Sequence, residues 1–219
     1  MTDLTNVGRT LFGYFRSSAA YRVRIALNHK GLAYRQQPVS LVRGEQRSED
    51  YLALNPQGLV PALLDNGVLL TQSLAICEYL DEAYPHTAAL LPTAAAMRAR
   101  VRAAAQSIAC DIHPLNNLRV LNYLKNELQQ PEEARNAWYR HWLQEGFAAL
   151  ELQLADSAGQ YCFGDDITLA DVCLLPQVFN ARRFNVEMAP YPLLAAIADR
   201  LELLPAFAAA HPAQQPDAV

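Results

Sequence analysis

The sequence lacks an apolar run of about 18 residues, the length that a membrane-spanning helix needs. Its first ten residues, MTDLTNVGRT, also lack the apolar core of a signal peptide. We therefore expect a cytoplasmic protein with no membrane partner. Charged residues make up only 18% of the chain and hydrophobic residues 52%, which excludes a disordered chain and allows a packed core.

Basic residues are fewer than acidic ones, 18 against 22, and the net charge is −4. A mildly acidic chain is a poor candidate for nucleic-acid binding, so we expect no nucleic-acid partner. Residues 16–47 are the exception, with seven basic residues and one acidic residue. Two interpretations stay open for this basic segment: a site for a small anionic ligand, or an ordinary solvated helix face.

Cysteine is scarce, with four residues that form no CxxC pair and no Cys/His cluster of zinc spacing. We therefore expect no metal site. In a reducing compartment these cysteines are most simply buried thiols. They are Cys77, Cys110, Cys162 and Cys173.

The two halves of the chain have different patterns, which predicts two domains at residues 1–88 and 93–219. The first mixes strand and helix signals and is predicted as α/β. An apolar run at 11–15 predicts a strand, and a helix over 19–30 should follow it. The predicted elements continue with a strand at 33–39, a turn-rich loop with a short helix, a hairpin around Asp65-Asn66-Gly67, and a helix from Gln72-Ser73 to Ala83.

The second half is predicted as all-helical, with periodic stretches over 94–128 and 131–156 and a further helix at about 192–203. Thr168 and Asp171 match a capping box, which should begin a buried helix despite Pro176. The polar tail from residue 214 onward is expected to be loose.

Three junctions in the first half could hold a ligand. Ser17 or Ser18 lies where a helix begins, and a helix N-terminus attracts anions and lowers the pKa of a thiol. Pro61 opens what we expect to be an edge strand and can be cis, which would leave the backbone of Val60 free for a peptide ligand. Gln72 and Ser73, at another helix start, suit a carboxylate. Taken alone, each feature is more simply explained by an ordinary cap or turn.

Taken together, these segments resemble the zeta class of cytosolic glutathione transferases, which includes maleylacetoacetate and maleylpyruvate isomerases. The resemblance covers about residues 11–217. It implies a thioredoxin-like N-terminal domain followed by an all-helical C-terminal domain. The matching segments are 14–18, 21–27, 54–56, 60–61, 72–76, 114–115, 117–118, 164–165, 170–174, 176–178, 180–181, 183–184 and 215–217.

The resemblance implies glutathione as the cofactor and assigns roles by position. Ser17 matches the serine that hydrogen-bonds the glutathione thiolate, with Ser18 beside it. Val60 matches the residue whose backbone pairs with the cysteinyl part, and Gln46 a glutamine near the glycyl end. Gln72 and Ser73 match the pair that binds the γ-glutamyl carboxylate. The resemblance also places His113, Asn117 and Arg119 in the segment of the helical domain that lines the site. His113 and Arg119 differ from the residues that animal members have there.

The sequence departs from the family pattern Ser-Ser-Cys, because Ala19 stands at the third position. This excludes a mechanism that needs a protein cysteine there and leaves one in which glutathione is the nucleophile. Arginines suit a substrate with two carboxylates, because the planar guanidinium bonds both oxygens of a carboxylate. The candidates are Arg16 and Arg119 first, then Arg183 and Arg182, each of which could instead form a structural ion pair.

The implied activity is a glutathione-dependent cis–trans isomerisation of a maleyl ketoacid to its fumaryl isomer. Thiolate addition makes the double bond single, rotation follows, and elimination restores the double bond. One alternative is a transferase that conjugates or dehalogenates small electrophiles, and another is a non-catalytic glutathione-binding protein. The run at 110–119 slightly favours maleylpyruvate over maleylacetoacetate. The resemblance also implies a homodimer that pairs the α/β module of one chain with the helices of the other.

Overall fold

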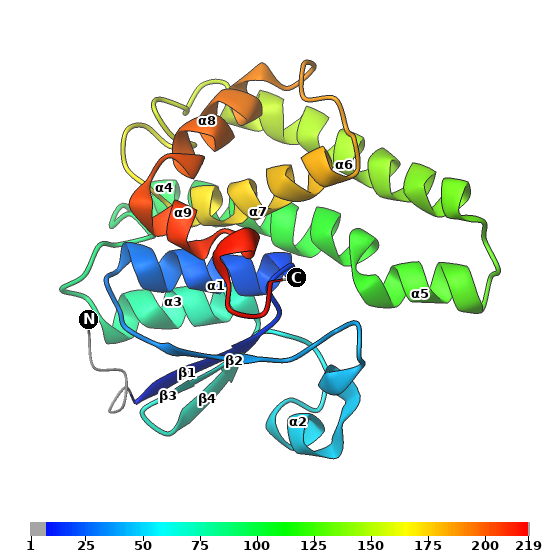
Figure 1. Cartoon of the computed structure of the whole chain (residues 1–219). Helices are drawn as coiled ribbons and strands as arrows, with labels where there is room; N and C mark the ends of the chain where they lie inside the picture. Colours follow the sequence, from blue (N-terminus) through cyan, green and yellow to red (C-terminus); the bar gives the residue numbers. More distant parts are fainter. Residues whose placement is uncertain (1–7, 219) are drawn as a thin grey trace. The chain divides into compact units, whose positions relative to one another are not determined.

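The computed structural model describes residues 8–218, which divide into two compact units. The first unit contains residues up to Leu90 together with the closing segment from Leu203, and the second contains Leu91–Glu202. Figure 1 follows the chain through both. The closing segment therefore clusters with the α/β residues, although it follows the helical ones in the sequence.

The first unit is built on a four-stranded mixed sheet in the order β2-β1-β3-β4, with β1 parallel to β2 and antiparallel to β3. Pro61 precedes β3, which lies between β1 and β4, so our expectation that it opens an edge strand is wrong. The first strand also begins and ends two residues earlier than predicted. The strands are β1 (Arg9–Gly13), β2 (Arg35–Pro38), β3 (Ala62–Asp65) and β4 (Val68–Thr71).

Helices cover both faces of this sheet. Alternate residues of β1 point to opposite sides, so Gly13 and Phe12 face different helices. An added Cβ at Gly13 would lie 3.1 Å from the Cβ of Ala20, so α1 lies close on one face. On the other face the ring of Phe12 meets that of Tyr51 at 6.5 Å. The helices are α1 (Ser18–His29), α2 (Glu49–Leu54) and α3 (Ser73–Ala83), and α1 packs against α3 (Figure 1).

Helix α1 begins and ends one residue earlier than the predicted range of 19–30. Ser17 is its N-cap, and Gly31, just past its end, has a φ of 66° that favours glycine. The basic residues within α1 are not a solvated face, since Arg22 and Arg24 are 2% and 0% exposed. Lys30 is also buried and pairs with Asp81 at 2.7 Å.

The chain's end is held in place, which contradicts the expected loose tail for the described residues. Gln215 is buried and donates to the carbonyls of Ala209 and His211 at 3.0 and 2.8 Å. Asp217 accepts from the backbone amide of Phe15 at 3.0 Å. The elements of this segment are α9 (Pro205–Ala210), which packs against α1, and the 3-10 helix η5 (Pro212–Gln214).

The second unit is helical, as predicted, but the periodic stretch over 94–128 forms two α-helices rather than one. A π-helical turn and a 3-10 turn, which contains Pro114, separate its two parts. The capping box of α7 is present: Asp171 accepts from the amide and hydroxyl of Thr168, and Pro176 lies within the helix. The elements are α4 (Ala95–Gln106), η3 (Ser107–Ile112), η4 (His113–Asn116), α5 (Leu118–Asn126), α6 (Glu132–Leu154), α7 (Leu169–Arg183) and α8 (Pro192–Glu202).

Three of the four cysteines are buried free thiols, as expected, but Cys110 is exposed. Within residues 8–218, none of the helices has the length and apolar character needed to span a bilayer. The same residues contain no group of three or more His, Cys, Asp or Glu side chains placed to hold a metal ion.

Candidate functional site

The sheet register brings the three predicted junctions of the first unit to the same end. Phe12 pairs with Ala62, and Ala62 pairs with Thr71, so these residues form one row across β1, β3 and β4. The chain leaves this row toward Ser17 on one strand and toward Ser73 on another. Val60 precedes the row on the strand between them. The three junctions therefore lie beside one another at one end of the strands.

Ser17 occupies the N-cap of α1 with extended backbone angles, φ −69° and ψ 117°. Its hydroxyl oxygen accepts from the amide of Ala20 at 3.2 Å, which leaves the hydroxyl proton free to donate. The side chain is half-buried, and Ser18 behind it is buried. A donor at a helix N-terminus can stabilise an anion such as a thiolate.

Two groups distant in sequence fix the loop before Ser17. Arg24 donates to the carbonyls of Tyr14 and Phe15 at 3.5 and 2.9 Å, and Asp217 accepts from the Phe15 amide. The loop is thus held from the helix side and from the C-terminal segment. Burial lowers the pKa of Arg24 to about 10, a value that keeps its charge at neutral pH.

Arg16 is exposed and lies against two aromatic rings. Its guanidinium carbon is 5.0 Å from the ring centre of Phe15, and one guanidinium nitrogen donates to the Tyr14 hydroxyl at 3.1 Å. The aromatic contacts orient the side chain while its charge stays in water. It is therefore available to a ligand carboxylate.

The Val60–Pro61 peptide bond is cis. Among the residues that the structure describes, no hydrogen bond involves the backbone of Val60. The neighbouring carbonyl of Leu59 is held by the Tyr51 hydroxyl and the Asn55 amide, each at 2.7 Å. A rigid loop thus presents an unused backbone donor and acceptor, the groups that an extended peptide pairs with.

Gln46 lies in the 3-10 helix η2 (Glu45–Arg47), which approaches this same loop. A Cβ added at Gly58 would be 2.9 Å from the Gln46 carbonyl oxygen, and Gly58 has a φ of 60°. The side-chain Oε1 of Gln46 is buried and has no partner within residues 8–218. The structure therefore places Gln46 against Gly58, two residues before Val60 in the same loop.

Gln72 has a φ of 68°, a backbone conformation that is strained for a residue with a side chain. Its side-chain amide donates to Gln57 at 2.9 Å. Ser73 is buried, and its Oγ accepts from Arg22 at 3.2 Å. Arg22 is not among the predicted site residues, although it lies in the basic segment at 16–47.

The remaining predicted residues belong to the second unit. His113 begins η4, directly after the π-helical turn η3, an irregularity often found at functional sites. Asn117 caps α5, and its side chain accepts from the amide of Arg119 at 3.1 Å. The side chain of Arg119 is exposed.

The two consecutive arginines at the end of α7 have different surroundings. Arg182 forms ion pairs with Asp199 and with Glu202, the latter at 2.8 Å, so its charge is already compensated within the second unit. Arg183 is exposed and lies 5.0 Å from the ring centre of Phe184. Burial raises the pKa of the adjacent Tyr139 to about 12, although Arg183 opposes this shift.

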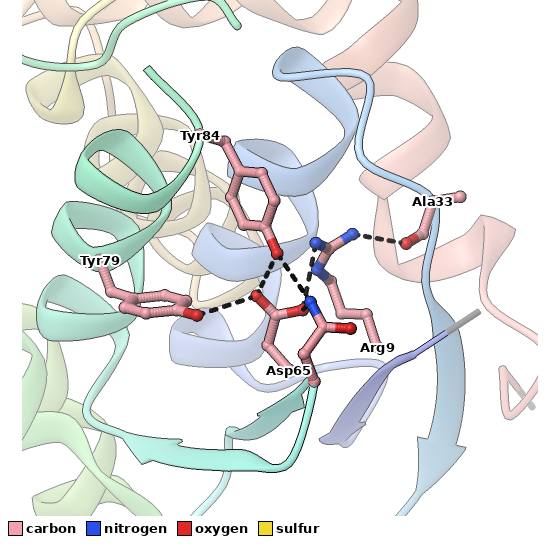
Figure 2. Close-up of polar contacts among 6 residues, drawn as sticks. Arg9, Ala33, Asp65, Tyr79 and Tyr84 are labelled. Atoms are coloured by element: carbon pink, nitrogen blue, oxygen red, sulfur yellow. Dashed lines mark hydrogen bonds and ion pairs between the residues drawn. The ribbon is translucent and has the colours of Figure 1, made fainter. Parts of the chain in front are cut away.

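A second polar cluster lies at the opposite end of the sheet (Figure 2). Asp65 is fully buried and pairs with Arg9 at 3.1 Å. The hydroxyls of Tyr84 and Tyr79 donate to the same carboxylate at 2.6 and 3.2 Å. The carboxylate of Asp65 has partners on both oxygens, so the cluster holds the hairpin to α3 and β1, while Arg9 Nε is buried without a partner among the described residues.

The sheet with its helices and the helical unit match family models that describe the two halves of a glutathione S-transferase. The model "Glutathione S-transferase, N-terminal domain" matches residues 8–82, and "Glutathione S-transferase, C-terminal domain" matches residues 132–209. A probable maleylacetoacetate isomerase of Vibrio cholerae is 54% identical over 95% of this chain and 97% of its own.

Solved structures agree. A holo maleylpyruvate isomerase, described as a bacterial glutathione S-transferase in zeta class, has a TM-score of 0.92 and 49% identity over 96% of this chain and 100% of its own. A maleylacetoacetate isomerase of Methylobacterium extorquens AM1 with bound malonate and GSH has a TM-score of 0.93 and 41% identity over 96% and 99%. The chain belongs to the glutathione S-transferase family and, within it, to the zeta class.

Proposed function

We propose that the protein is a glutathione-dependent isomerase that converts a maleyl ketoacid, maleylpyruvate or maleylacetoacetate, to its fumaryl isomer in aromatic-compound catabolism. The observation that carries the proposal is that the segments with Ser17, Val60 and Ser73 lie at the same end of neighbouring strands. The names of the relatives support the reaction. The neighbour with bound malonate and GSH supports a site that takes a thiol tripeptide and a small dicarboxylate.

Glutathione, when bound, supplies a thiolate that adds reversibly to a double bond conjugated to carbonyls. The residues of the first unit fit this cofactor. Ser17 donates its hydroxyl proton to the sulfur, and the N-terminus of α1 favours the ionised form. Val60 pairs with the cysteinyl backbone, Gln46 serves the glycyl end, and Gln72 and Ser73 hold the γ-glutamyl carboxylate.

The arginines bind the substrate in this proposal. Arg16 and Arg119 are exposed cations, and Arg183 is the next candidate. A guanidinium beside the substrate ketone also stabilises the negative charge that develops on its oxygen. The two ion pairs of Arg182 make it the weakest candidate of the four. For His113 and Asn117 of the helical unit, the glutathione-binding role stays a proposal from the resemblance.

The test compares maleylpyruvate, maleylacetoacetate and a halogenated acid as substrates, each with and without glutathione. We expect one or both maleyl ketones to isomerise only when glutathione is present. Halide release without isomerisation would favour the transferase and dehalogenase function instead. Isomerisation at an equal rate without glutathione would refute the proposed chemistry.

We also propose a cytoplasmic homodimer. All four cysteines are free thiols, which suits a reducing compartment. The edge strand β4 carries two exposed apolar residues, Val68 and Leu69, whereas the other edge strand, β2, has the polar sequence RQQP. An apolar edge without protecting charge is a typical place for a second subunit.

A further inference from the structure

Helix α1 buries two arginines, and only one of them is fully hydrogen-bonded. Arg24 uses Nε, Nη1 and Nη2 on the carbonyls of Ala210, Tyr14 and Phe15. Arg22 is 2% exposed and donates only through Nη1, to the Oγ of Ser73 at 3.2 Å. Its Nε and Nη2 are buried without a partner in the described part of the chain.

The charge of Arg22 is uncompensated as well. Across residues 8–218, no carboxylate forms an ion pair with Arg22. A buried guanidinium without a counter-ion is costly, and an unsatisfied buried donor in a native structure calls for an explanation. The hydroxyl that it does contact belongs to the first residue of α3, and the N-terminus of that helix adds its own positive potential.

We propose that Arg22 is a positioning residue that prepares Ser73 for a carboxylate ligand and supplies the charge that selects it. Because Ser73 Oγ accepts from the guanidinium, its proton is directed away from Arg22 and is left to donate to the ligand. The ligand carboxylate in turn provides the missing negative charge. This inference rests on the proposed function, in which that group is the γ-glutamyl carboxylate of glutathione.

The experiment measures calorimetric binding of two probes, glutathione and cysteinylglycine, which has the thiol but lacks the γ-glutamyl group. Arg22→Met keeps the side-chain length and removes the charge. We expect it to weaken glutathione binding about 10- to 100-fold, the range for loss of a charge-assisted contact, with little change for cysteinylglycine. Arg22→Lys, which keeps the charge, should recover part of the loss.

A double-mutant cycle separates positioning from a purely structural role. If Arg22 acts through Ser73, then Arg22→Met should cost less affinity for glutathione in a Ser73→Ala background than in the wild type. Arg24→Met is the matched control, a buried arginine of the same helix with all its donors on carbonyls. It should lower the melting temperature and change the affinity for both probes by the same factor.

The outcomes are distinguishable. Wild-type protein that binds neither probe would refute the proposed function itself. Wild-type binding of glutathione with Arg22→Met changing both probes equally, or neither, would overturn the inference and leave the proposed function standing. Additive effects in the double mutant would also contradict it, because independent residues show no coupling.

Discussion

Asp65 shows how much one residue can contribute when its carboxylate is fully enclosed. Its carboxylate accepts hydrogen bonds from the hydroxyls of Tyr79 and Tyr84 and pairs with Arg9. The residue is fully buried, so water does not reach the carboxylate. Asp65→Asn should lower the free energy of unfolding by about 3–5 kcal/mol, because it leaves the buried arginine uncompensated. Urea unfolding measures the change. Asp156→Asn, an exposed control, should shift it little; equal small effects for both variants would contradict the prediction.

Ser17 is the residue on which the proposed chemistry depends most. Ser17→Ala should reduce isomerase turnover about 100-fold, because the sulfur loses a preorganised donor, while glutathione still binds through other contacts. Steady-state kinetics with a maleyl ketone measures this. Thr168→Ala removes a comparable helix cap from α7 and should leave turnover per folded molecule unchanged. Unchanged turnover in Ser17→Ala would rule out the proposed role.

His29 should make stability depend on pH. Burial lowers its pKa below 6.5 in the folded state, with Lys30 adding to the effect and Asp81 opposing it. Below pH 6.5 the unfolded chain binds more protons, so stability is complete above that pH and is lost as the pH falls toward the folded pKa. The free energy of unfolding, measured by urea between about pH 7.5 and 5, should fall less steeply in His29→Gln. His86→Gln, an exposed control, should keep the wild-type slope; matching slopes in all three proteins would contradict the prediction.

At the scale of single elements, local signals were reliable where the neighbours lie within a few residues. The capping box of α7 and the glycine after α1 depend on contacts three or four residues apart, and both are confirmed. The helical stretch predicted over 94–128 is divided by η3 and η4, which pack against α6 and α7, and Pro114 in η4 is the local signal of this division that the periodicity did not capture.

Helix α8 is an element whose start depends on a distant side chain. Its first amides, of Leu193 and Leu194, donate to the carboxylate of Glu151 on α6 at 2.7 and 3.0 Å. Glu151→Gln should cost about 1–2 kcal/mol of stability, since it removes an anion from a helix N-terminus. Thermal unfolding tests this. Glu133→Gln, an exposed acid in the first turn of α6, is the control for a dipole effect without the bidentate contact, and a loss no larger than in that control would refute it.

For the whole molecule, the order of elements could be predicted from sequence, whereas the contacts that complete the site could not. The three junctions were identified because serine, proline and glutamine signals occur locally. Arg22 and Ser73 are 51 residues apart, and Asp217 and Phe15 are 202 apart. Such pairs form only when the sheet and α1 have assembled. The periodicity and spacing of the sequence therefore do not predict them.

Assembly of two chains is the prediction at this scale. Sedimentation should find a species of about twice 24.3 kDa, and Leu69→Asp on the edge strand β4 should shift it toward the monomer because a charge would enter the apolar contact. Leu203→Asp changes the most exposed leucine of residues 8–218 and should leave the distribution as it was. A wild-type sample that sediments only as the monomer would refute the dimer.

The hydrogen bond between Asp217 and the Phe15 amide links the C-terminal segment to the loop on which the proposed chemistry depends. Trimming the protein after Ala213, or fusing a bulky tag that pulls the C-terminus outward, would release one restraint on the strand-to-helix loop that carries Ser17. A variant shortened at this end is therefore expected to turn over its substrate more slowly than the full chain.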